Sequence, residues 1–303
     1  MRIAVIGATG VIGTAAVRTL TSAGHSVVGM ARDTRKARLL EGLGAEARHT
    51  SLTDHAGLVA MLEGADAVCN LTSSVPVGLA ALRPGAWRAN DRLRTEGVRR
   101  VLEAAREARV RRVVQAGVSF LYADQGSAWV GEDAPLEITP ATEPASVAES
   151  LVQEYCCGSR TGVALRLATI VGDDPMTRST LRSARNGVAV GLGAPEGWAH
   201  VIHTDDLGPA VLGALSVQSG VYNVGAEPVR RADLMEGFSQ AVGRSTTFVG
   251  PLARRLGGVR MEPLARSLRV SSDLFTAHSG WSPTRASFDT SWFPGQLRSE
   301  ALR

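Results

Sequence analysis

Lysine is nearly absent from this chain. Of its 33 basic residues only Lys36 is a lysine, so a mechanism that needs a catalytic lysine must use Lys36 or be abandoned. Cysteine is also scarce. Cys69, Cys156 and Cys157 form no pattern typical of a disulfide framework or a metal site, which suits a reducing cytoplasm. The sequence therefore predicts a cytoplasmic protein without metal.

Long apolar runs and clusters of basic residues are also missing. No run is long enough to span a bilayer, and glycines interrupt the apolar N-terminus, so we expect neither a membrane segment nor a signal peptide. The net charge of +4 is spread along the chain, which disfavours nucleic-acid binding. Because 44% of the 303 residues are hydrophobic, the chain can bury a sizeable core. A small molecule is the expected partner.

The first twenty residues read as a strand, a glycine-rich turn and a helix. Arg2 to Ile6 is a short apolar run, and Thr14 to Leu20 has helical spacing. This order is typical of the opening of a dinucleotide-binding unit, in which the helix N-terminus offers free amides to the phosphates. The predicted cofactor contacts in this turn are Gly7, Thr9, Gly10, Val11, Ile12 and Gly13.

The end of the second strand predicts which dinucleotide is bound. NAD-binding folds place an acidic residue there to accept hydrogen bonds from the ribose hydroxyls. Here Arg32 occupies the region, and its guanidinium can pair with a 2′-phosphate. We therefore favour NADP(H). Asp33, one place later, leaves NAD(H) open, and a solvated helix start is the simpler interpretation of this basic stretch.

Strands and helices alternate over residues 1–167, which predicts an α/β fold with a Rossmann-type, doubly wound parallel sheet. Residues 201–224 return to it, while 168–200 and 225–303 form a smaller substrate-binding lid. We expect a flexible loop at 75–86, one long helix at 87–109 and a covering loop at 124–144. Ligands bind at the carboxyl ends of parallel strands. The remaining predicted cofactor contacts are Ser51, Leu52, Leu71, Thr72, Ser73 and Asn90.

Ordered motifs along nearly the whole chain resemble those of the extended short-chain dehydrogenase/reductase family, the nucleotide-sugar epimerases and dehydratases with their reductase relatives. They are the glycine turn, Leu165 to Gly172, Val201 to Asp206, Val221 to Gly225 and the Gly-Trp-Ser-Pro of 280–283. The resemblance implies a nicotinamide cofactor. It also implies a Tyr-x-x-x-Lys pair, in which the tyrosine transfers a proton and the lysine lowers its pKa.

The catalytic pair of that family has no counterpart here. Alignment on the helix glutamate, Glu154, places Ser146 at the tyrosine position and Ser150 at the lysine position. The family's catalytic Ser or Thr falls at Val118, one residue before Ser119. A serine hydroxyl cannot replace the phenol, because its pKa is much higher and its reach is shorter. We therefore predict that the chain still binds the cofactor and that its catalytic residues are non-standard.

Four functions remain open at this stage. The first is an NADP(H)-dependent reductase or epimerase of specialised metabolism, in which another side chain relays the proton. The second is a non-redox cyclase, dehydratase or isomerase, the third a cofactor sensor, and the fourth a structural partner in a complex; a homodimer fits any of them. The catalytic candidates are Ser119, Tyr122, Ser146, Ser150 and His203, with Asp124 and Glu149 as further acids, and the substrate contacts are Trp87, Trp129, Thr169 and Trp198.

Overall fold

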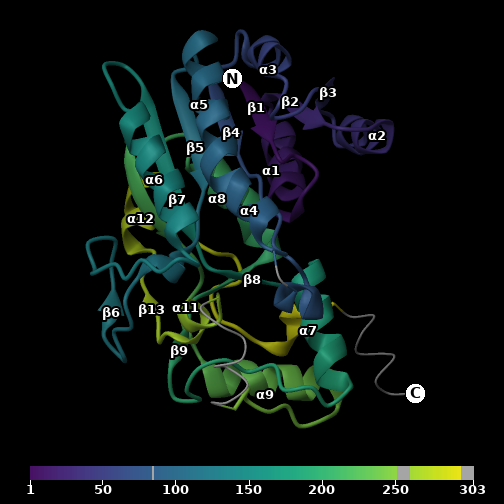
Figure 1. Ribbon diagram of the computed structural model, residues 1–303, viewed down its shortest axis with the longest axis vertical. Helices are drawn as coiled ribbons and strands as arrows, with labels where there is room; N and C mark the ends of the chain where they lie inside the picture. The colour runs from purple at the N-terminus through teal and green to yellow at the C-terminus, as the bar shows by residue number, and fades with distance from the viewer. Residues whose placement is uncertain (84, 251–259, 295–303) are drawn as a thin grey trace.

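A central parallel sheet organises the protein in the computed structural model, which describes residues 1–83, 85–250 and 260–294. Seven strands follow the order β11-β7-β5-β4-β1-β2-β3, and every neighbouring pair is parallel. This arrangement confirms the predicted doubly wound α/β fold (Figure 1). The strands are β1 (Arg2–Ile6), β2 (Ser26–Ala31), β3 (Glu46–His49), β4 (Ala67–Asn70), β5 (Arg112–Ala116), β7 (Thr161–Leu167) and β11 (Gly220–Val224).

Helices cover both faces of this sheet because successive strand residues point to opposite sides. Ile3 and Val5 of β1 join one buried cluster, whereas Ala4 and Ile6 join the other. The first face is covered by α1 (Val11–Ser22), α2 (Thr34–Gly42), α8 (Leu207–Gly213) and α12 (Asp273–Ser279). The second face is covered by α3 (His55–Leu62), α5 (Val98–Glu107) and α6 (Glu143–Tyr155).

A smaller unit lies below the carboxyl ends of the strands in Figure 1. It has its own apolar core, which includes Leu181, Phe238 and Trp292. The unit contains the pairs β8 (Thr169–Val171) with β10 (Val201–His203) and β9 (Trp198–Ala199) with β12 (Val229–Arg230), and the helices α7 (Pro175–Arg185), α9 (Arg231–Val242) and α11 (Glu262–Ala265). Parts of the predicted lid, at 251–259 and 295–303, lie outside the described residues.

Three predicted segments contain local structure that the sequence did not indicate. The helix predicted for 87–109 is divided into α4 (Arg88–Arg92), a π-helical turn (Leu93–Gly97) and α5. The loop at 75–86 contains a 3₁₀ turn (Gly78–Leu82), and residue 84 lies outside the described residues. The covering loop at 124–144 contains β6 (Trp129–Val130), which pairs with β13 (Arg269–Val270). Apolar periodicity carries no sign of a π turn or of so distant a strand partner.

Among the described residues, no helix has the length and apolar character needed to cross a membrane.

Candidate active site

The glycine turn brings three backbone segments into close contact. Gly7 has a φ of +80°, and a Cβ there would lie 2.8 Å from the carbonyl carbon and oxygen of Leu71. A Cβ on Gly13 would lie 2.1 Å from the Gly7 oxygen. Real Cβ atoms do not approach backbone so closely, so β1, the exit of β4 and the start of α1 fit together only because both positions are glycine.

The N-terminus of α1 is open to an anion. Gly10 is its N-cap residue and makes no side-chain cap, and the first turn contains no acidic residue. Val11 and Ile12 are half-buried, and Gly10 is exposed. The first amides of a helix lack intrahelical acceptors and carry a partial positive charge, so this turn fits the pyrophosphate of a dinucleotide.

Two charged residues, Arg32 and Asp33, follow β2 and have different roles. Asp33 is the N-cap of α2: its Oδ1 accepts the Lys36 amide at 2.9 Å, and its Oδ2 lies 3.9 Å from Lys36 Nζ. Both carboxylate oxygens are therefore engaged. Arg32 is exposed and makes no hydrogen bond or ion pair within the described part of the chain. The guanidinium is thus available to a ligand at this edge, whereas the carboxylate is held by the helix.

Buried polar side chains mark the carboxyl ends of β4 and β5. Asn70 donates to Gln115 at 2.8 Å and accepts the Thr72 hydroxyl at 2.8 Å. Asn90 of α4 is buried, and its Oδ1 accepts the Ser74 amide at 3.2 Å. Leu71 is buried, Ser73 is exposed, and Ser51 shares a 2.9 Å hydrogen bond with Thr53. The backbone of Leu52 accepts Arg100 at 3.3 Å. These residues line the same edge as the glycine turn.

Helix α6 carries the two serines expected at the catalytic positions. Ser146 is half-buried and Ser150 is exposed. Glu149, between them, forms a buried ion pair with Arg166 of β7 through contacts of 2.9 and 2.5 Å. This carboxylate is therefore committed to structure and is not a free base.

Tyr122 is fully buried beneath the same ion pair. Its hydroxyl donates to Asn223 Oδ1 at 2.8 Å, and the Arg166 guanidinium lies 4.7 Å from its ring centre. Burial raises the pKa of Tyr122, so the phenol stays protonated at neutral pH. Glu132 accepts the Asn223 amide at 2.8 Å and ties the 124–144 segment to β11. The hydroxyl of this tyrosine is therefore occupied by a structural hydrogen bond.

Ser119 is paired with a histidine that the sequence did not single out. Its Oγ lies 3.0 Å from His200 Nδ1, and both residues are buried. His200 Nε2 has no hydrogen-bond partner among the described residues, and a Cβ on Gly225 would lie 2.0 Å from it. Burial lowers the pKa of His200 to about 3, so the imidazole is neutral at physiological pH. No spacing pattern links positions 119 and 200, because their proximity arises from the fold.

The other proton-relay candidates also have structural partners. His203 is buried, accepts the Asp205 amide at 3.2 Å, and packs its ring 5.3 Å from that of Trp292. Asp124 accepts the amides of Gly126 and Ser267 at 2.8 and 2.9 Å. The catalytic roles suggested for them remain predictions.

Each predicted tryptophan contact is covered by an arginine. Arg260 lies 5.3 Å from the Trp87 ring centre, and Trp87 Nε1 donates to the Ala81 carbonyl at 3.1 Å. Arg269 lies between Trp129 and Trp198, at 4.1 and 4.5 Å from their ring centres. Trp129 is 57% exposed, and Thr169 is also exposed. The structure thus groups Trp129 with Trp198 around one arginine, and places Trp87 at the start of α4.

Arg94 is a buried charged residue that the sequence interpretation did not single out. It is only 8% exposed, its Nη1 is buried, and its guanidinium makes no hydrogen bond to any described residue. Burial lowers the pKa of Arg94 to about 10, against the opposing charge of Asp91. A signal was present: Arg94 continues the spacing of Val98, Val101 and Ala105, which form the apolar stripe of α5.

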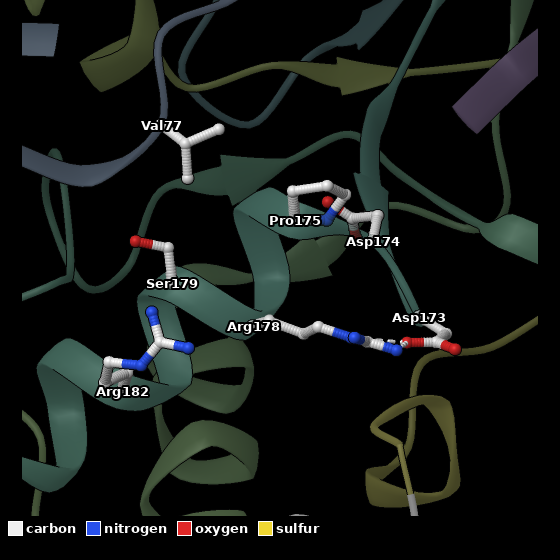
Figure 2. A pocket seen from close by; sticks show the side chains of 7 residues that line it. All are labelled: Val77, Asp173, Asp174, Pro175, Arg178, Ser179 and Arg182. Carbon is white, nitrogen blue, oxygen red and sulfur yellow. Dashed lines mark hydrogen bonds and ion pairs between the residues drawn. The ribbon is translucent and has the colours of Figure 1, made fainter. Parts of the chain in front are cut away.

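A charged pocket of about 480 Å³ lies beside α7 and the segment after β4. Asp174 is the N-cap of α7, and Arg178 pairs with Asp173, as Figure 2 shows. The Arg182 side chain points toward Ser179 and away from the Arg178–Asp173 pair. None of the predicted site residues lines this pocket, whose other members are Val77 and Pro175.

Comparisons with known proteins agree on the family. A model of the NAD dependent epimerase/dehydratase family matches residues 3–225. A Streptomyces protein named 3-diazoavenalumate denitrifying reductase is 32% identical over 308 residues, covering 95% of this chain and 98% of that protein. The UDP-glucose 4-epimerase of Thermotoga maritima, solved with UDP-glucose, has a TM-score of 0.77 at 18% identity and covers 100% of this chain and 99% of its own. MoeE5, solved with UDP-glucose and NAD, has a TM-score of 0.75 at 21% identity with the same coverage.

Proposed function

Because the chain belongs to the NAD dependent epimerase/dehydratase family, we propose that it is an NADPH-dependent reductase that replaces the diazo group of a small aromatic acid by hydrogen. The observation that carries this proposal is the Streptomyces relative, which is 32% identical and matches 95% of the chain. Its name describes a reduction that removes nitrogen from 3-diazoavenalumate. The solved structures, at 18% and 21% identity, support only the fold.

This reaction suits a chain without the family's proton-transfer pair. A reduced nicotinamide supplies a hydride ion when it is bound. At an arenediazonium carbon, the hydride electron pair forms the new C–H bond, the C–N bond breaks, and its electron pair leaves with N₂. The positive charge of the diazonium group is neutralised, and no substrate oxygen gains a proton in this step. A chain whose single lysine is Lys36, with Ser146 and Ser150 on α6, therefore needs no tyrosine as a proton donor in this step.

The choice of NADPH rests on the end of β2. Arg32 is exposed and unpaired among the described residues, whereas both oxygens of Asp33 are engaged by Lys36. A free guanidinium can bind a 2′-phosphate, and a carboxylate that caps a helix is poorly placed to accept hydrogen bonds from a ribose. In this proposal the amides at Gly10 to Gly13 hold the pyrophosphate, and the enzyme serves specialised metabolism in the cytoplasm.

The test is the predicted reaction itself. Purified protein is incubated with NADPH and 3-diazoavenalumate, and avenalumate, N₂ and NADP⁺ are measured together. We expect the three products in equal amounts, and a slower reaction with NADH. Saturable NADPH binding without turnover of any diazo acid would favour the sensor, and product formed without nucleotide would favour non-redox chemistry. Either result contradicts the proposal.

A further inference from the structure

We propose that Arg94 binds the carboxylate of the substrate and thereby selects acids over neutral analogues. This inference rests on the proposed function, since it assigns the acid group of that substrate to a residue. Arg94 is 8% exposed, and Nη1 is buried with no partner among the described residues. Buried charges in folded proteins are normally paired, because an isolated ion loses its hydration without compensation. The missing partner is then a ligand.

Asp91, three residues before Arg94, already has an ion-pair partner. Both oxygens of Asp91 accept from Arg260, at 3.2 and 2.5 Å, and Arg260 also donates to the Ala141 carbonyl at 3.0 Å. Arg94 and Arg260 both feel the charge of the Asp91 carboxylate, but the hydrogen bonds of Asp91 go to Arg260. This corner of the site has an excess positive charge. A carboxylate matches a guanidinium in a two-point hydrogen-bonded pair, which Arg94 still has free.

The position of Arg94 points to the substrate and not to the nucleotide. It lies one turn after Asn90, which binds the Ser74 amide at the exit of β4, so the two share a helix face toward the carboxyl edge of the sheet. The π-helical turn that carries Arg94 packs on α6, the helix of Ser146 and Ser150. The expected phosphate contacts, the glycine turn and Arg32, instead follow β1 and β2.

In Figure 1, α4 and α5 follow one another, and α4 forms the end that faces the smaller unit. This position agrees with a substrate contact. Trp87 stands at the start of α4 with Arg260 over its ring. An aromatic ring at the start of α4 and an unpaired guanidinium in the π-helical turn that follows α4, two turns apart, provide the two groups that recognise an aromatic carboxylate.

The experiment compares avenalumate with its methyl ester by titration calorimetry on the NADP⁺-loaded protein. We expect the acid to bind at least tenfold more tightly than the ester in the natural protein. Arg94→Gln should bring the two affinities within threefold, and Arg94→Lys should keep part of the preference. Arg92→Gln is the matched control, because it removes the same charge from an exposed position on the same helix. NADP⁺ affinity should change less than twofold in all variants, which also shows that they are folded.

Equal binding of acid and ester by the natural protein overturns the inference, as does an Arg94→Gln variant that loses NADP⁺ and not the acid preference. An equal effect of Arg92→Gln overturns it as well, since the charge alone would then explain the result. An acid preference that depends on Arg94, in a protein that releases no N₂ from the diazo acid, overturns the proposed function and supports the inference.

Discussion

The edge of the sheet that carries the glycine turn and the region around α6 differ in what their polar groups do. At the glycine turn the amides of α1 have no side-chain cap, and Arg32 is unpaired among the described residues. Around α6, Glu149 is bound to Arg166, Tyr122 to Asn223, and Ser119 to His200. The first region is prepared for a ligand, whereas the second holds its titratable groups in internal contacts.

If the proposed function is right, binding and chemistry have separated within this fold. A dinucleotide site depends mainly on backbone geometry, which glycines preserve. Proton transfer depends on a few side chains, and the proposed function does not call on Glu149, Tyr122 or Ser119, which the structure holds in internal contacts. A reaction that needs a hydride but no enzymatic proton is compatible with both observations.

The largest expected effect is on the α6 side. Glu149→Ala would leave Arg166 buried without its ion-pair partner, and we expect the free energy of unfolding to fall by about 3–5 kcal/mol. Urea denaturation measures this change. Glu154→Ala, an exposed position on the same helix, should change stability by less than about 0.5 kcal/mol. Lost activity with unchanged stability would instead make Glu149 a catalytic base.

On the other side, Gly13→Ala should weaken NADPH binding at least 100-fold, about 2.7 kcal/mol, because its Cβ would overlap the Gly7 carbonyl. Tryptophan quenching on titration with NADPH measures the affinity. Gly42→Ala in α2 is the control, since no atom lies within 4 Å of a Cβ there. Normal NADPH affinity in Gly13→Ala would show that the nucleotide does not use this turn.

Arg32→Ala tests which nucleotide the edge prefers. We expect NADPH binding to weaken by about 1.5–3 kcal/mol, the range for a hydrogen bond to a charged group, with NADH binding unchanged. Tryptophan quenching on titration with NADPH and with NADH measures both affinities. Arg35→Ala, exposed on the following turn, should affect neither. An unchanged preference for NADPH in Arg32→Ala would move the 2′-phosphate contact elsewhere.

The smallest expected effect concerns pH. Burial lowers the pKa of His200 from 6.5 to about 3, so below pH 6.5 the unfolded chain binds a proton there that the folded chain does not. Stability should therefore fall from pH 7 to pH 5 by about 2 kcal/mol through this residue. Glu132 and Asp174 have raised pKa values, which act on stability in the opposite direction. Denaturation of the natural protein and of His200→Asn at both pH values separates the contribution of His200 from theirs. An equal fall in the stability of His200→Asn between pH 7 and pH 5 would contradict the assignment of this effect to His200.

The sequence predicted best what depends on local pattern. Strand alternation predicted the parallel sheet, and the glycine turn predicted the tight junction between β1 and α1. The π-helical turn, the β6–β13 pair and the Ser119–His200 contact depend on segments that meet only in the fold. Arg94 lay on an apolar stripe, yet its burial depends on packing against α6, which periodicity does not report.

The most direct test follows the transferred hydrogen. NADPH carrying deuterium at each transferable position in turn is supplied with 3-diazoavenalumate in ordinary water, and the avenalumate formed is analysed by mass spectrometry and NMR. The expected result is one deuterium, from one of the two labelled forms, on the carbon that lost nitrogen. Avenalumate without deuterium from either form, or labelled only when the water is D₂O, would contradict direct hydride transfer and with it the proposed function.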